Sequence, residues 1–308
     1  MARLLNINLA DPFMKALKAV NSKTNSGTSL TKEDLEKQRS SMERASILAT
    51  PVTGVSYESI DVNGISCEWS RPDFPHNTSV VILYAHGGGY TTGGLLYARI
   101  LAAKLALNAG LEVLSFDYRL APENKYPAAL EDAEAVYDYL LHIGYGAKNV
   151  ILAGDSAGGN LVLCLTQKLV AEARKSPKAL ILFSPWTDMS AKNESYVEQK
   201  EKDPILTYEY IIAVRDAYIG KDADASDAKY SPINGSFEGF PPVLIQVGKN
   251  EVLQDDSNLL AKKINKAGGS AVLKLYKDGW HVFQQMPTPG AARAMQEVGE
   301  YVRSLIYE

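Results

Sequence analysis

The chain has 308 residues and a formal net charge of −4, and both facts restrict the kind of protein it can be. A chain of this length can bury a large hydrophobic core in one or two domains without disulfide or metal support. Because the charge is slightly negative, the chain has no broad basic field of the kind that binds nucleic acid, so we expect no nucleic-acid partner.

The cysteines and the N-terminal residues bear on the cellular compartment. Cys67 and Cys164 are the only two cysteines, which is too few for a disulfide framework or a metal site and fits a reducing compartment. The N-terminus is a poor signal peptide because Asn6, Asn8 and Asp11 interrupt its apolar stretch. No segment approaches the roughly 20 apolar residues of a membrane span. We therefore expect a soluble, cytoplasmic protein with no stable membrane anchor and with neither a metal nor an organic cofactor.

The first part of the chain is predicted to be helical and polar up to about residue 50. Thr31 and Asp34 resemble a capping pair that opens a helix over residues 32–47. Two weaker β runs follow, at residues 55–62 and 65–69, and they flank the Asn-Gly pair at residues 63–64. Asn-Gly is the strongest short hairpin signal, so the sheet is expected to begin antiparallel.

The rest of the chain alternates short aliphatic or β-branched runs with amphipathic helical stretches. Several of the runs are apolar on both faces, which is typical of strands covered on two sides in a mostly parallel sheet. The expected strands span residues 80–85, 113–118, 150–153, 180–183, 243–247 and 272–276, and the expected helices span residues 95–108, 127–142, 161–173, 256–267 and 291–306. This alternation predicts the α/β class.

Residues from about 188 to 240 interrupt the alternation. The segment contains a predicted helix over residues 205–219 and then an Asp/Ala-rich turn. An insertion of this length after a strand is usually a lid or cap over a site. A surface excursion without a role is the alternative.

Ser156 lies in the run Gly-Asp-Ser-Ala-Gly-Gly at residues 154–159. Gly-x-Ser-x-Gly between a predicted strand and a predicted helix is typical of a nucleophile elbow. Such a turn exposes the serine Oγ at the carboxyl end of the strand. It also places the Ala157 amide at a helix N-terminus, where the partial positive charge favours a developing oxyanion. We therefore predict that Ser156 is the nucleophile of a serine hydrolase.

A second glycine-rich run, His-Gly-Gly-Gly at residues 86–89, follows the predicted strand at 80–85. Three glycines leave the backbone bare, so its N–H groups can point at a substrate oxygen. The run does not fit a phosphate loop, because it lacks both a following Lys-Ser/Thr and the Gly-x-Gly-x-x-Gly spacing. His86 itself is expected to orient this loop.

The nucleophile needs a base, which near neutral pH is usually a histidine. Of the four histidines, His76 and His142 are expected to be in solvent, and His86 belongs to the glycine run. His281 follows the last predicted strand, where the chain order of serine, acid and histidine in elbow hydrolases places the base. His281 is therefore the predicted base.

Three motifs together resemble the hormone-sensitive-lipase family of esterases (bacterial family IV). They are the glycine-rich runs at residues 86–89 and 154–159 and Tyr-Arg-Leu-Ala-Pro-Glu at residues 118–123. The likeness covers roughly residues 55–308. It implies an α/β-hydrolase fold, with a mostly parallel eight-stranded sheet flanked by helices and a helical cap. It assigns the oxyanion hole to the amides of Gly88, Gly89 and Ala157 and makes residues 118–123 a structural support near the site.

The same resemblance implies the domain organisation. In that family the cap comes from the N-terminus and from an insertion after the sixth strand, which matches the two segments outside the alternation. We expect residues 1–50 to form N-terminal cap helices, residues 51–187 and 241–308 the catalytic domain, and residues 188–240 the cap insertion. Members often dimerise through an edge strand, here residues 272–276, so a homodimer is a further expectation.

The resemblance also places the triad acid in the loop after residues 243–247. The family pattern there is Asp-Pro-Leu, and Glu-Val-Leu at residues 251–253 occupies those positions, so Glu251 replaces the aspartate. Glutamate is one methylene longer but can still orient the imidazole and stabilise the imidazolium. Asp255 is the alternative acid, and Asp256 is expected to be the N-cap of the following helix.

These inferences predict a serine carboxylesterase that uses a Ser156–His281–Glu251 triad and an acyl-enzyme. The expected substrates are small esters of short to medium chain length. Two alternatives use the same scaffold: an amide hydrolase, or a ligand-binding receptor like the plant gibberellin receptors, which lose the histidine that is retained here. Candidates for either the pocket wall or the packing of the cap are Phe13, Trp186, Tyr208 and Ile212.

Overall fold

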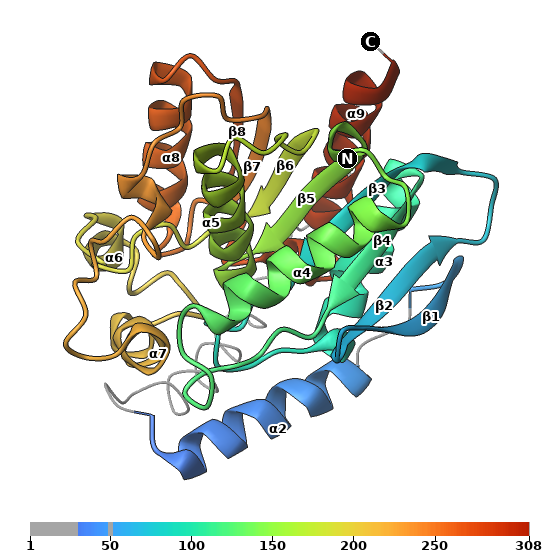
Figure 1. Cartoon of the computed structure of the whole chain (residues 1–308). Helices are drawn as coiled ribbons and strands as arrows, with labels where there is room; N and C mark the ends of the chain where they lie inside the picture. The colour runs from blue at the N-terminus through green and yellow to red at the C-terminus, as the bar shows by residue number, and fades with distance from the viewer. Residues whose placement is uncertain (1–29, 49–51, 308) are drawn as a thin grey trace, which may run out of the picture.

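A computed structural model describes residues 30–48 and 52–307 (Figure 1). Within these residues eight strands form one sheet in the order β1-β2-β4-β3-β5-β6-β7-β8. The pairs β1/β2 and β2/β4 are antiparallel and the others are parallel, which confirms the predicted α/β-hydrolase sheet. The strands are β1 (Val55–Val62), β2 (Ile65–Pro72), β3 (Asn77–Ala85), β4 (Leu111–Phe116), β5 (Val150–Asp155), β6 (Ala179–Phe183), β7 (Val243–Gly248) and β8 (Ala271–Tyr276).

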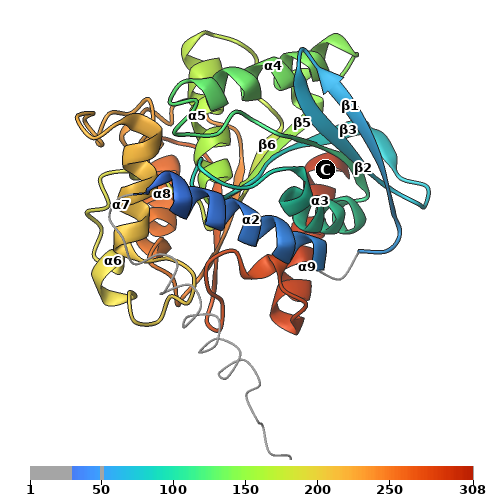
Figure 2. The same cartoon turned by 90° about the horizontal axis from the view of Figure 1, so that it is seen from below.

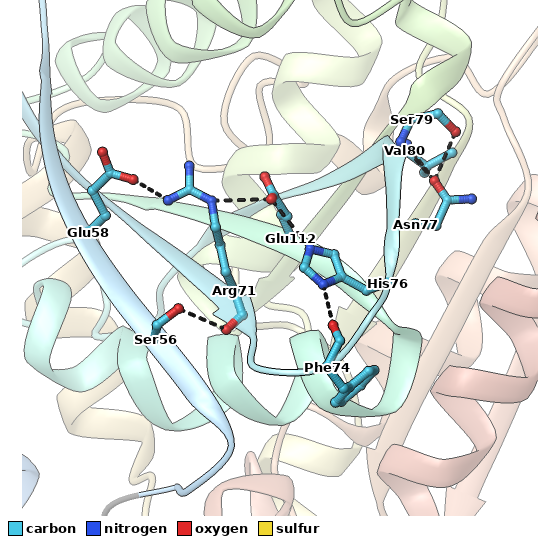
Figure 3. Close-up of polar contacts among 9 residues, drawn as sticks. All are labelled: Ser56, Glu58, Arg71, Phe74, His76, Asn77, Ser79, Val80 and Glu112. Atoms are coloured by element: carbon cyan, nitrogen blue, oxygen red, sulfur yellow. Dashed lines mark hydrogen bonds and ion pairs between the residues drawn. The ribbon is translucent and has the colours of Figure 1, made fainter.

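The sheet begins with the predicted hairpin. Asn63 and Gly64 both have positive φ, 54° and 86°, as a two-residue type I′ turn requires. Arg71 on β2 then pairs with Glu58 on β1 and, at 3.2 Å from its Nε, with Glu112 on β4 (Figure 3). One guanidinium therefore ties the three strands of the antiparallel part together.

Helices cover both faces of the sheet. The helices α4 (Ala128–His142), α5 (Ala157–Ala171) and α8 (Gln254–Lys266) lie on one face, and α3 (Leu95–Ala109) and α9 (Pro289–Tyr307) lie on the other (Figure 1). Successive side chains of a strand point to opposite faces, so Val81 and Leu83 of β3 belong to one apolar cluster and Ile82 and Tyr84 to the other. The central strands are buried on both sides for this reason.

Most predicted elements are present with ends shifted by a few residues, but α5 begins four residues earlier than its predicted start at residue 161. The extra residues are 157–160, which include two glycines and an asparagine, all weak helix formers. Packing explains the difference. A Cβ at Gly158 would lie 2.0 Å from the Ala85 carbonyl oxygen, so only glycine allows α5 to approach β3 this closely.

The helix α2 (Lys32–Leu48) lies across the edge at which the parallel strands end (Figures 1 and 2). Its predicted cap is confirmed. Thr31 Oγ1 accepts a hydrogen bond from the Asp34 amide (3.1 Å), and Asp34 Oδ2 accepts one from the Thr31 amide (3.2 Å). The side chains of Leu35 and Gln38 are buried and anchor the helix.

Residues 188–240 contain α6 (Ser195–Glu198), α7 (Tyr208–Ile219) and the 3₁₀ turn η2 (Pro232–Asn234). Outside this segment, the described residues also form the 3₁₀ turns η1 (Ala147–Asn149) and η3 (Phe283–Gln285). The helix α7 begins three residues later than predicted because Thr207 is its N-cap and accepts a hydrogen bond from the Tyr210 amide at 3.1 Å. Among the helices of the described residues, none is long and apolar enough to cross a membrane.

Candidate active site

Ser156 occupies the turn between β5 and α5. Its φ of 53° and ψ of −116° form a backbone conformation that a residue with a side chain adopts only under strain. The turn is held from the β6 side, because the Ser156 amide donates to the Phe183 carbonyl (2.9 Å) and the Ser156 carbonyl accepts from the Trp186 amide (3.1 Å). This is the geometry of a nucleophile elbow at the carboxyl end of a central strand.

The residue before Ser156 connects the elbow to the glycine loop, residues 86–92. Asp155 is fully buried, and its Oδ1 accepts from the Gly87 amide at 2.8 Å and from the Tyr84 hydroxyl at 2.5 Å. Its Oδ2 accepts from the Tyr97 hydroxyl at 2.8 Å. Burial raises the pKa of Asp155 to about 6 although these hydrogen bonds oppose the rise. The sequence pattern had assigned no role to Asp155.

The glycine loop turns sharply after β3. Gly88 and Gly89 have φ of 114° and 63°, and the Gly88 carbonyl accepts from the Thr91 and Thr92 amides at 3.1 and 3.0 Å. A Cβ at Gly88 would lie 2.3 Å from the Thr92 carbonyl oxygen, so the turn requires glycine. Within the described part of the chain, no group accepts a hydrogen bond from the amides of Gly88, Gly89 or Ala157.

The His86 side chain packs between the backbone of its own loop and Tyr118. Its Nδ1 is 2.7 Å from the Gly87 carbonyl oxygen, and its ring stacks on Tyr118 with the centroids 4.2 Å apart. The Tyr118 hydroxyl in turn donates to the His86 carbonyl at 2.8 Å. Burial lowers the pKa of His86 to about 4, so the ring is neutral near pH 7.

The structure brings Glu251 and His281 together from the loops that follow β7 and β8. Glu251 Oε2 lies 3.8 Å from His281 Nδ1. This is longer than a hydrogen bond, and among the described residues His281 Nδ1 has no hydrogen-bond partner. Burial raises the pKa of Glu251 well above its usual value, with the charge of Asp203 adding to the rise, and burial lowers the pKa of His281 to about 3. Burial thus disfavours the charged form of each group.

Ser184, which the sequence pattern did not single out, connects Glu251 with the loop that carries His281. Its hydroxyl donates to Glu251 Oε2 at 2.9 Å and accepts from the Val282 amide at 3.1 Å, and the residue is fully buried. The signal in the sequence is weak: Ser184 is the first residue after the predicted strand at residues 180–183, at the sheet edge where the other site residues gather.

The two aspartates after Glu251 have partners in or beside the insertion. Asp255 Oδ2 accepts from the Ser195 amide at 3.0 Å. The prediction that Asp256 is an N-cap is wrong, because α8 begins at residue 254 and the Asp256 carboxylate accepts from the amides of Thr187 (2.7 Å) and Asp188 (3.0 Å). The chain entering the insertion packs against the start of α8 and supplies these donors. Burial raises the pKa of Asp256 to about 7.

The other histidines lie away from this pair. The expectation that His76 is in solvent is wrong, because its side chain is only 13% exposed. Its Nε2 is 3.4 Å from Glu112 Oε1 and its Nδ1 is 2.7 Å from the Phe74 carbonyl oxygen (Figure 3). His142 is exposed, as expected. In residues 30–48 and 52–307, no group of three or more His, Cys, Asp or Glu is placed to hold a metal ion.

The four candidates for the pocket wall separate in the structure. Trp186 is buried and its Nε1 donates to the Asp188 carbonyl at 3.2 Å, so it belongs to the packing below the insertion. Tyr208 is exposed, and Ile212 is half-buried against the core. Phe13 lies outside the described residues.

Comparisons with known proteins agree with this geometry. A family model described as the α/β-hydrolase fold matches residues 82–285. An esterase of Acinetobacter venetianus is 35% identical over 227 residues, which cover 73% of this chain and 75% of that protein. An acetyl-hydrolase of Streptomyces hygroscopicus is 34% identical over 247 residues, which cover 80% and 82% of the two chains.

The solved structures point the same way. The crystal structure of an esterase from the bacterial hormone-sensitive-lipase family matches with a TM-score of 0.87 and 32% identity, covering 96% of this chain and 98% of that one. The fold and the elbow define an α/β hydrolase. Within that class, the chain belongs to the bacterial hormone-sensitive-lipase family and is a carboxylesterase.

Proposed function

We propose that the enzyme hydrolyses short- to medium-chain carboxylic esters through an acyl-enzyme on Ser156. His281 accepts the Ser156 proton as Oγ attacks the ester carbonyl, and the amides of Gly88, Gly89 and Ala157 stabilise the resulting oxyanion. His281 then protonates the departing alkoxide and activates the water that releases the acid.

One observation carries this proposal: the strained Ser156 and the buried Glu251–His281 pair follow β5, β7 and β8, which are parallel strands of one sheet. The carboxyl ends of parallel strands meet at one edge, where open α/β sheets bind their ligands. Glu251 is the proposed acid, since it lies 3.8 Å from His281 and Asp255 contacts Ser195 instead.

The preference for short acyl chains has two supports. One relative is an acetyl-hydrolase, and another, from Pseudomonas putida, is an ethyl acetate hydrolase. In the structure, the Val214 side chain of α7 lies 3.1–3.2 Å from the position that a Cβ of Gly89 would take. The insertion therefore packs against the proposed oxyanion loop. We assign residues 1–50 and 188–240 to a cap that confines the substrate.

Two wider proposals concern the assembly and location of the enzyme. The edge strand β8 exposes Val272 and Leu275, which supports a homodimer paired through β8. The two buried free cysteines, Cys67 and Cys164, support a cytoplasmic location.

Labelling and substrate profiling test the proposed function. An organophosphate should label the protein at one residue, Ser156, and Ser156→Ala should abolish both labelling and turnover of p-nitrophenyl acetate. Rates should fall as the acyl chain of p-nitrophenyl esters lengthens, and an ester should react faster than its matched amide. Turnover by Ser156→Ala would refute the mechanism, and a faster amide would favour an amide hydrolase.

A further inference from the structure

A single arginine of α2 contacts the glycine loop and the segment beside it. Arg39 Nε donates to the Thr91 carbonyl at 2.8 Å, and its Nη2 donates to the Ala121 carbonyl at 3.0 Å. The same guanidinium forms a bidentate pair with Glu123, at 2.9 and 2.8 Å. One planar group therefore joins the loop after β3 to residues 118–123 after β4.

These contacts lie next to the proposed oxyanion donors. The amide and the hydroxyl of Thr91 both donate to the Gly88 carbonyl, at 3.1 and 3.4 Å, so Thr91 sets the direction of a peptide unit in the glycine turn. The Ala121 amide also donates to the Tyr90 carbonyl at 2.8 Å. Arg39 thus holds both of the segments that fix the loop.

The ion pair itself is a weak source of stability. The Arg39 side chain is about one third exposed (32%) and that of Glu123 is 55% exposed, and partly exposed pairs contribute little to folding. Leu35 and Gln38 are buried and anchor α2 independently of Arg39. The arrangement is directional, however, because the guanidinium fork fixes the angles of several hydrogen bonds at once.

We propose that Arg39 is a positioning residue that holds the glycine loop so that the amides of Gly88 and Gly89 meet the transition-state oxyanion. A turn built on glycines is intrinsically flexible, whereas oxyanion stabilisation requires donors fixed to a fraction of an ångström. The N-terminal cap helix, seen from below the sheet in Figure 2, thereby contributes to the chemical step as well as covering the site. This inference rests on the proposed oxyanion hole.

The test compares Arg39→Met with Arg44→Met, which changes an exposed arginine of the same helix. In Arg39→Met we expect kcat for p-nitrophenyl acetate to fall about 10- to 100-fold while KM changes little. A trifluoromethyl ketone, which forms an oxyanion on Ser156, should lose affinity by a similar factor. The matched alcohol, which forms no oxyanion, should bind as before. The kcat and the ketone affinity of Arg39→Lys should lie between those of wild type and Arg39→Met, because an ammonium cannot make all four contacts.

Each outcome has one meaning. Circular dichroism and urea unfolding check folding, and Arg39→Lys carries the test if Arg39→Met does not fold. Kinetics and ketone affinity equal to those of Arg44→Met would overturn the proposal, and so would equal weakening of ketone and alcohol, which would place Arg39 in substrate binding. A wild-type enzyme that the ketone does not inhibit would refute the proposed function itself, whatever the Arg39 variants show.

Discussion

Glu251 carries its carboxylate on one methylene more than the aspartate of the family pattern, and that carboxylate contacts both Ser184 and His281. Glu251→Gln keeps the side chain's shape but removes the charge that, in the proposed triad, favours the working imidazole tautomer. We expect kcat to fall about 10³- to 10⁴-fold with little loss of stability. Steady-state kinetics and thermal melting check this. Asp255→Asn is the matched control and should stay near wild-type activity; the reverse ranking would make Asp255 the acid.

Ser184 offers a second test at the scale of single residues. Its hydrogen bond lowers the pKa of Glu251, so Ser184→Ala should raise that pKa. Because the ionised carboxylate is the form that orients His281 in the proposed triad, the acid limb of kcat/KM should move to higher pH, and kcat should fall about 10-fold. A pH profile with 1-naphthyl acetate measures both effects. Ser257→Ala, at another buried serine, should leave the profile unchanged, and an unmoved limb in Ser184→Ala would contradict the assigned role.

At the scale of elements, the approach of α5 to β3 supports the elbow. Gly158→Ala would place a Cβ 2.0 Å from the Ala85 carbonyl oxygen and 2.5 Å from that of His86. Because both atoms belong to backbone, the elbow or the glycine loop must shift. We expect a loss of about 1–3 kcal/mol in the free energy of unfolding, together with a lower kcat. Gly146, with φ of −73° and open space around it, is the control. Urea unfolding should show Gly146→Ala at least as stable as wild type and Gly158→Ala clearly less stable.

The elements also show what single-sequence patterns can predict. Strands buried on both faces and the Asn-Gly hairpin have local signatures, and the strand-turn-helix pattern at residues 150–171 correctly placed Ser156 in the turn between β5 and α5. Arg39 has no such signature, because its partners lie 52, 82 and 84 residues away in the sequence. The same holds for Ser184, whose partners lie 67 and 98 residues away. The start of α5 was missed because close packing overrides the weak helix propensity of glycine.

At the scale of the whole molecule, Ser156 and His281, the proposed nucleophile and base, lie at the same carboxyl edge of the sheet as the segments that we propose as the cap. The helix α2 is attached there through Arg39, and the insertion is attached through Asp256, which accepts from the Thr187 and Asp188 amides and from Asn193 Nδ2 at 2.8 Å. In both attachments a side chain with a polar end group forms hydrogen bonds to backbone groups. The attachment of α2 and the insertion to the sheet therefore depends on hydrogen bonds as well as on apolar burial, and the raised pKa of Asp256 makes the attachment of the insertion sensitive to pH.

The sign of this pH dependence follows from burial. The pKa of Asp256 is raised to about 7 and that of Asp155 to about 6, so between about pH 4 and 7 the folded state binds more protons than the unfolded state. The contribution of these groups to stability is complete below about pH 4 and is lost as the pH rises through 6 and 7.

Asp256→Asn keeps an oxygen acceptor for the two amides but cannot ionise. The free energy of unfolding in urea should therefore fall less between pH 5 and pH 7 in Asp256→Asn than in wild type, by on the order of 1–2 kcal/mol. Asp73→Asn, which changes an exposed carboxylate, is the control, and its free energy of unfolding should fall between pH 5 and pH 7 by as much as that of wild type. An Asp256→Asn slope equal to that of wild type would show that Asp256 is ionised in the folded state across this range and that the insertion is held by an ordinary charged carboxylate.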